Sequence, residues 1–151
     1  GNIKKYKERY TYPSPLFITD VYSVARAYAD PHRAWDYQRA EEKVYEVETT
    51  CDKVAVINAY NERFRFIDVD SVIRGFVNAG ISEEEVKNVI ESLTFNQRDK
   101  TKIKTDVISV LGNWFNFDCI DVKGVLDSYH GGTTKSTVRM VLDPSKVKII
   151  K

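Results

Sequence analysis

Helix-like and strand-like hydrophobic patterns occupy different parts of this chain. Three amphipathic helices are predicted in the middle, roughly over residues 68–115, because apolar residues there recur every three or four positions. Strand-like segments lie on both sides of this region, in residues 16–19, 43–58 and 117–150. Segregation of this kind predicts an α+β fold with a mixed or antiparallel sheet, rather than a doubly wound parallel sheet.

Each of the three middle segments has a single apolar stripe, which is typical of a helix that packs one face on a core. The first segment ends at Gly80, and the second opens with a capping box from Ser82 to Glu85. The third is predicted over residues 101–115. The stripe residues are Val69, Val72, Ile73 and Phe76, then Val86, Val89, Ile90 and Leu93, then Ile103, Val107, Leu111 and Trp114.

The length and the charge balance limit the classes of protein that this chain can represent. A chain of 151 residues is most simply one domain, here residues 1–151, with the helical segment at about 68–115. The 23 basic and 22 acidic residues leave a net charge of +1. Balance of this kind indicates neither a nucleic acid nor a membrane surface as the partner. No run of 18 apolar residues predicts a membrane span.

The cysteine and histidine content predicts no metal site. Cys51 and Cys119 are too few for a disulfide framework in a chain of this length, and zinc-binding spacings with the two histidines are absent. The N-terminal residues also lack the apolar region of a secretory signal peptide. A reducing cytoplasm is therefore the expected location.

Two segments carry most of the functional information, and the first is "PLFITDVYSVARAYAD", residues 15–30. Residues 16–19 read as a short strand, Asp20 suits a helix N-cap, and apolar residues at 21, 24, 25 and 28 predict a helix. This order resembles the second motif of ADP-ribosyltransferases of the diphtheria-toxin and poly(ADP-ribose) polymerase branch, and of phage toxins with the same fold. Phe17, Asp20, Ser23 and Tyr28 occupy the matching positions.

The second segment is "STVRMVLDPSKVKII", residues 136–150, which reads as a strand, an Asp143-Pro144 corner and a second short strand. It is similar to the last strand of the same family, where an aromatic-valine strand reaches Asp-Pro, and Arg139 to Pro144 and Val147 fit that register. The upstream "FDCIDVKGVLDSYHGG", residues 117–132, is similar to the strand and loop that precede it in phage members, with a turn predicted over residues 128–132. If both matches hold, Phe17 and Val141 must lie in strands of one sheet.

The resemblance implies a split mixed or antiparallel sheet with a helical insertion, and a site for NAD as the substrate. Tyr28 matches the tyrosine that stacks on nicotinamide, and a planar ring on a rigid element suits that task. Thr19 and Ser23 would shape the pocket. The first family motif, which binds the NAD ribose, is not found before Leu16, and Arg9 is the candidate substitute.

The position of the family's catalytic glutamate is Val138 in this chain. A carboxylate is needed to stabilise the oxocarbenium-like ribose of the transition state. Asp127 is the nearest candidate, with His130 beside it as a phosphate ligand or base. The alternative is that Asp127 and Ser128 only cap a hairpin turn.

Three functional hypotheses remain from the sequence. One is a phage- or toxin-type mono-ADP-ribosyltransferase that modifies a protein, or less expectedly a nucleic acid, in the host cytoplasm. The second is a degenerate member of the fold that binds a protein partner or ADP-ribose, for example as a phage inhibitor of a host defence protein. The third is an unrelated α+β domain. No metal cofactor is expected under any of them.

Overall fold

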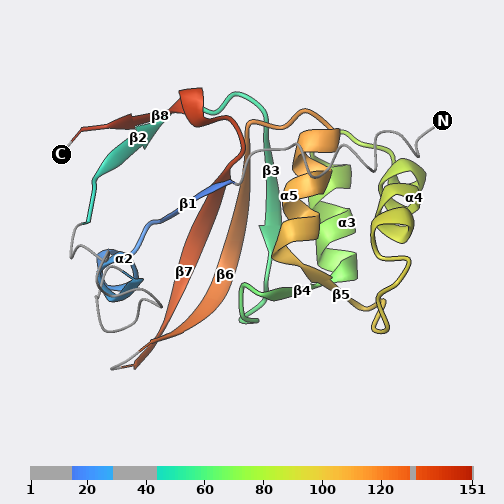
Figure 1. The fold of residues 1–151 in the computed structure, drawn as a ribbon, viewed down its shortest axis with the longest axis horizontal. Coiled ribbons are helices and arrows are strands. Elements are labelled where there is room, and N and C mark those ends of the chain that lie inside the picture. Colours follow the sequence, from blue (N-terminus) through green and yellow to red (C-terminus); the bar gives the residue numbers. More distant parts are fainter. Residues whose placement is uncertain (1–14, 29–43, 130–131, 151) are drawn as a thin grey trace.

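A computed structural model describes residues 15–28, 44–129 and 132–150, and it has the α+β architecture predicted from the sequence (Figure 1). Its centre is a four-stranded sheet in the order β1 (Leu16–Thr19), β7 (Gly132–Val141), β6 (Cys119–Tyr129) and β3 (Val54–Asn58). The β1–β7 and β6–β7 pairs are antiparallel, and the β3–β6 pair is parallel. The prediction of a mixed sheet is therefore confirmed.

Three helices cover one face of this sheet, namely α3 (Val69–Asn78), α4 (Glu83–Leu93) and α5 (Thr105–Trp114). In Figure 1, α3 and α5 lie next to the sheet and α4 lies outermost. The predicted stripes form the core together with the inward residues of the strands, and the largest fully buried members include Phe76, Ile108, Leu111, Ile120 and Met140. Burial of such side chains contributes about 1.5–3 kcal/mol each.

A two-stranded ribbon of β4 (Phe66–Asp68) and β5 (Lys102–Lys104) lies at the start of α3 and α5. The prediction that Ile103 begins the third helix is wrong, because α5 starts at Thr105. Ile103 is buried opposite Ile67 in the ribbon. The sequence pattern was ambiguous at this point. Ile103 and Val107 are four residues apart, which fits one face of a helix, but a short strand with a single buried side chain at Ile103 fits the same residues.

The opposite face of the sheet is flanked by α2 (Tyr22–Tyr28) and by an antiparallel ribbon of β2 (Val47–Thr49) and β8 (Val147–Ile149) (Figure 1). A short 3-10 helix, Pro144–Lys146, turns the chain from β7 into β8. Asp143 caps this helix, because its carboxylate accepts hydrogen bonds from Ser145 N at 3.1 Å and Ser145 Oγ at 2.7 Å. The predicted Asp-Pro corner and the second strand are confirmed.

The hairpin between β6 and β7 is longer than predicted. Ser128 pairs with Thr133 and Tyr129 pairs with Gly132, so the ladder runs through most of the predicted turn at residues 128–132. Ladder pairing satisfies the backbone groups of these residues, although their composition is typical of a turn. The prediction that residues 128–132 form the turn is therefore wrong.

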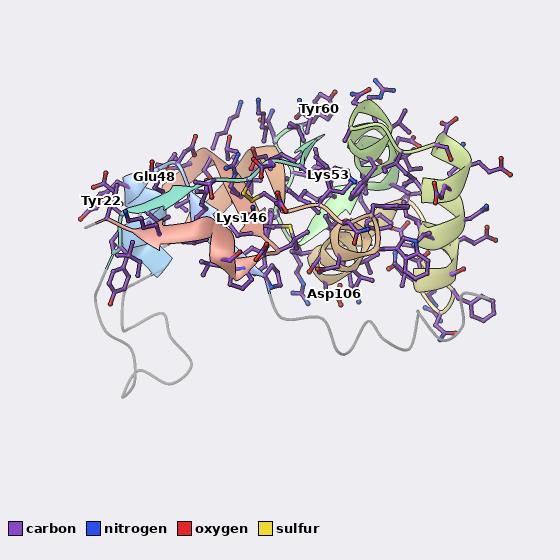
Figure 2. The ribbon with its side chains drawn as sticks, turned by 90° about the horizontal axis from the view of Figure 1, so that it is seen from above. Tyr22, Glu48, Lys53, Tyr60, Asp106 and Lys146 are labelled. Atoms are coloured by element: carbon purple, nitrogen blue, oxygen red, sulfur yellow. A yellow bond between two sulfur atoms is a disulfide. The ribbon has the colours of Figure 1, made fainter. Side chains whose placement is uncertain are left out.

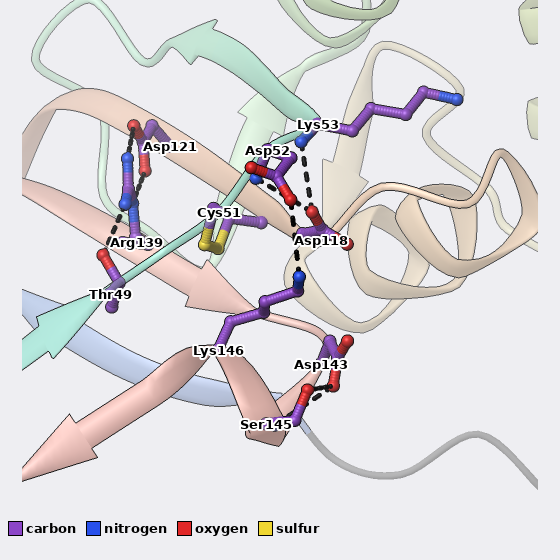
Figure 3. Close-up of a disulfide and its surroundings, with 11 residues drawn as sticks. Thr49, Cys51, Asp52, Lys53, Asp118, Asp121, Arg139, Asp143, Ser145 and Lys146 are labelled. Carbon is purple, nitrogen blue, oxygen red and sulfur yellow. Dashed lines mark hydrogen bonds and ion pairs between the residues drawn. A yellow bond between two sulfur atoms is a disulfide. The ribbon is translucent and has the colours of Figure 1, made fainter.

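The two cysteines are joined to each other, with 6.1 Å between their Cα atoms (Figure 3). The cause is the parallel register of β3 on β6, which sets Val54 opposite Cys119 and brings Cys51 just upstream within reach. The expectation of a reducing cytoplasm assumed that the cysteines formed no disulfide. Since disulfides are uncommon in reduced compartments, this pairing removes that support for a cytoplasmic location.

Candidate functional site

The two segments that resemble ADP-ribosyltransferase motifs lie on neighbouring strands. In the β1–β7 pair, Leu16 is opposite Val141, Phe17 is opposite Met140 and Thr19 is opposite Val138. Phe17 and Val141 therefore belong to one sheet, as the resemblance requires, and this prediction is confirmed. The fold thus brings segments from opposite ends of the chain into direct backbone contact.

The turn after β1 is fixed to β7 by a reciprocal pair of hydrogen bonds. Asp20 Oδ1 accepts from Thr137 N at 2.9 Å, and Asp20 N donates to Thr137 O at 3.3 Å, although the two residues are 117 positions apart. Thr19 Oγ1 accepts from Val21 N at 3.2 Å. Asp20 was expected to cap the following helix, but its carboxylate instead holds the turn against β7. These contacts set the direction in which α2 leaves the sheet.

Helix α2 carries the next two predicted site residues. Ser23 is exposed in its first turn, whereas Val24 is buried and anchors the helix. The helix lies against β1 and also contacts β6, the strand that bears Asp127. Tyr28 is the last residue of α2, and its side chain lies outside the described residues. Ser23 is therefore accessible to a ligand at the surface of α2.

Asp127 is a ladder residue of β6, where its backbone pairs with Thr134. The prediction that Asp127 belongs to a strand is confirmed, but the turn that Asp127 and Ser128 were expected to cap lies further along, because the ladder continues through Tyr129. The side chain of Asp127 lies outside the described residues, as do His130 and Arg9 entirely. The structure thus brings α2 to the strand of Asp127 but leaves the carboxylate itself unplaced.

Val138, at the position that the resemblance gives to the catalytic acid, is part of the hydrophobic core. Its side chain is 8% exposed and belongs to the same cluster as Val122 and Met140. Its cross-strand neighbours are Thr19 on β1 and Val122 on β6. A carboxylate at this point would lie among apolar side chains, so the catalytic acid of an active enzyme must come from another position.

An ion pair on the opposite face of the sheet was not predicted from the sequence. Arg139 Nε lies 2.6 Å from Asp121 Oδ1, and Nη2 lies 2.8 Å from Oδ2 (Figure 3). Arg139 Nη1 donates to Thr49 Oγ1 at 2.6 Å. The hydrogen bonds from Arg139 to Asp121 raise the pKa of the guanidinium above its usual value. Through these three hydrogen bonds, Arg139 tethers β2 to the sheet.

The face of the sheet on which Arg139 lies could have been predicted from the sequence. Side chains alternate along β7, so Arg139 points away from the core side, where Val138 and Met140 lie. Its partner could not, because Asp121 lies 18 residues upstream on another strand. The pairing becomes visible only once the register of β6 on β7 is known, which sets Asp121 directly opposite Arg139.

A cavity of about 680 Å³ lies away from these residues, between β3, α3 and the loop at residues 59–62.

Among the residues that the structure describes, no group of three His, Cys, Asp or Glu side chains converges to hold a metal ion. Within the same ranges, no helix has the length and apolarity needed to cross a membrane. No protein-family model, no curated protein and no solved structure matches this chain.

Proposed function

We propose that this protein is a mono-ADP-ribosyltransferase of phage or toxin type, which transfers ADP-ribose from NAD to a macromolecular target. The observation that carries the proposal is the pairing of β1 with β7, which brings the two motif-like segments together. The separate four-stranded sheet and β2–β8 ribbon are compatible with the split sheet of that family. A protein is the favoured target, because the net charge of +1 gives no general attraction to nucleic acid.

The proposed reaction breaks the bond between nicotinamide and the ribose C1′. Nicotinamide leaves with the bonding electrons, and a nucleophile of the target attacks C1′ and loses its proton. In this proposal, Tyr28 stacks on nicotinamide, Thr19 and Ser23 line the pocket, and Arg9 contacts the ribose. Asp127 stabilises the positive charge that develops on the ribose, and His130 binds phosphate or accepts the proton.

The burial of Val138 favours a second candidate function. A member of the fold without its acid would retain the binding surface and lose the chemistry. Such a protein would bind ADP-ribose or a protein partner, for example a host defence protein. The two candidates differ in one measurable respect, because the enzyme forms a covalent product and the binding module does not.

The test is incubation of the protein with labelled NAD and cell lysate. The enzyme proposal predicts label on a macromolecule, which is lost in Tyr28→Ala and in Asp127→Asn. Matched controls are Tyr22→Ala, an exposed tyrosine on the same helix, and Glu84→Gln, an exposed acid on α4. Both controls should transfer label as the wild type does.

Three outcomes separate the hypotheses. Label transfer that is unchanged in Tyr28→Ala and Asp127→Asn contradicts the assigned roles. Absence of transfer together with saturable binding of ADP-ribose supports the binding module. Absence of both transfer and binding of NAD or ADP-ribose at millimolar concentration contradicts an NAD-related function.

A further inference from the structure

The cavity between β3 and α3 lies at the opposite edge of the sheet from β1. Its floor includes Val54 and Val56 on the outer face of β3, and Val56 is 44% exposed. Helix α3 comes close to this edge strand at Gly75, where an added Cβ would lie 2.7 Å from the backbone oxygen of Val56. The volume is within the range of sites that bind small molecules, which is about 300–1,000 Å³.

The charges that line the cavity are unevenly compensated. Glu62 pairs with Lys102, and the Asp68 carboxylate accepts from Asp70 N at the start of α3. Arg74 and Lys123 also line the cavity, and within the described ranges neither forms an ion pair or a side-chain hydrogen bond. The guanidinium of Arg74 and the ammonium of Lys123 can therefore donate to an anion with several oxygens, such as a phosphate, although the Asp68 and Asp70 carboxylates line the same cavity.

An aromatic ring stands at the loop that closes one side of this cavity. Tyr60 lines the cavity and is 65% exposed. In Figure 2, Tyr60 projects beside α3, well away from Tyr22 at the α2 end of the molecule. An exposed ring of this kind can stack on a planar ligand.

The backbone that presents Tyr60 is unusual. Tyr60 has φ of 50° and Asn61 has φ of 70°, so two successive residues other than glycine occupy the left-handed region. The conformation is held by Asn58 Oδ1, which accepts from Tyr60 N at 2.9 Å, and by Gly124 O, which accepts from Asn61 N at 2.9 Å. Glu62 N also donates to Ala59 O at 3.0 Å, so residues 59–62 form a tight turn, in which Asn61 tolerates a positive φ and Tyr60 is the less usual residue.

Carboxylates complete the lining. Asp70 is exposed on the same side of α3 as Arg74, and no ion pair joins the two. Glu62 Oε2 is buried without a hydrogen-bond partner among the described residues. Because this oxygen is closed off from solvent, a ligand cannot reach it, and the exposed Asp70 carboxylate is the acceptor available to a hydroxyl donor. Sugar hydroxyls are donors of this kind.

From this arrangement we infer that the β3–α3 cavity binds a nucleotide, with its phosphate at Arg74 and Lys123, its base on Tyr60 and its ribose hydroxyls at the Asp70 carboxylate. The inference does not rest on the proposed transferase activity. A phosphorylated sugar without a base shares the phosphate and hydroxyl chemistry. Tyr60 is the element that distinguishes the two ligands.

The test is calorimetric titration of the protein with adenosine monophosphate, ribose 5-phosphate and inorganic phosphate. Adenosine monophosphate should bind saturably, and Arg74→Gln and Lys123→Gln should each weaken its binding at least about tenfold, as expected for loss of a charge-assisted contact. Tyr60→Asn removes the ring but retains a residue that tolerates a positive φ. This substitution should lower the affinity for adenosine monophosphate to that for ribose 5-phosphate, and it should leave the affinity for ribose 5-phosphate unchanged.

The matched control is Lys135→Gln, an exposed lysine on β7 outside the cavity, which should leave all affinities unchanged. The inference is overturned if adenosine monophosphate shows no saturable binding, or if inorganic phosphate binds as tightly as the nucleotide. It is also overturned if Tyr28→Ala abolishes nucleotide binding while the three cavity variants do not, since the ligand then occupies the β1–α2 site. If the wild-type protein transfers no label from NAD but binds the nucleotide in the cavity, the transferase proposal fails and the cavity inference stands.

Discussion

Val138 occupies the position at which the proposed transferase function would place a catalytic carboxylate. Strand alternation points Val138 and Met140 towards the helical layer, and both are buried there. The neighbouring Arg139 points to the other face and is taken up by Asp121 and Thr49. A catalytic carboxylate at position 138 would require the core side of β7 to be open to solvent, which it is not.

Replacing Val138 by Glu should therefore destabilise the protein without creating an active site. An unpaired carboxylate in this core should lower the free energy of unfolding by about 3–5 kcal/mol. Urea denaturation measures the change, with Lys135→Glu on the same strand as the exposed control, for which a change within about 0.5 kcal/mol is expected. A stable Val138→Glu protein with increased ADP-ribosyl transfer would contradict the placement of this residue in the core.

Asp143 gives the corner after β7 a specific dependence on pH. Hydrogen bonds from the Ser145 side chain and backbone lower the pKa of Asp143 below its ordinary value of 3.8. The stabilisation from this group is therefore fully present above pH 3.8 and is lost as the pH falls through the lower pKa of the folded state.

Thermal unfolding should show this loss as a difference between wild type and Asp143→Asn, in which the cap cannot titrate. The wild type should be the more stable protein near neutral pH, and its advantage should shrink below about pH 4. An advantage that stays constant through the acidic range would show that the ionised carboxylate does not stabilise the corner.

At the scale of elements, the β2–β8 ribbon is held to the sheet by several separate contacts (Figure 3). Thr49 is bonded to Arg139, and the Cys51–Cys119 disulfide follows immediately along the chain. Asp118 Oδ2 then accepts from Asp52 N at 2.9 Å and from Lys53 N at 3.1 Å. This short ribbon depends on the contacts, because a two-stranded ribbon alone is marginally stable in water.

Loss of the disulfide should lower global stability by about 4 kcal/mol, since the bond closes a loop with a sequence separation of 68 residues. Urea denaturation with and without dithiothreitol measures this effect. Cys51→Ala is the control, and its stability should not respond to the reductant. If the wild type is equally stable in both conditions, the crosslink does not stabilise the folded chain.

At the scale of the whole molecule, patterns with a regular period were predictable and pairings across the sequence were not. The stripes of Val72 and Phe76, or Val86 and Ile90, repeat locally and identify helices that the structure confirms. The bond from Cys51 to Cys119 and the pairing of Arg139 with Asp121 depend on strand register. The β3–α3 cavity likewise exists only because α3 packs along β3, and single lining residues gave no signal.

The proposed site itself was predicted in part. The pairing of residues 16–19 with the strand that ends at Val141 was predicted from a resemblance of the two segments to one family pattern, and the structure confirms the pairing alone. It could not show that Val138 faces the core or that Asp127 lies within a ladder, since both depend on the length of the β6–β7 hairpin.

Calorimetric titration with NAD tests the central claim most directly, because the β1–α2–β7 arrangement is proposed to bind this molecule. Saturable binding of NAD to the wild type is expected, with at least about a tenfold loss of affinity in Tyr28→Ala and no loss in Tyr22→Ala. Tyr60→Asn should leave this Tyr28-dependent binding unchanged, because any binding of the adenosine phosphate half of NAD in the β3–α3 cavity is a separate event. Absence of saturable NAD binding, or binding that is equally tight in Tyr28→Ala, would contradict the claim.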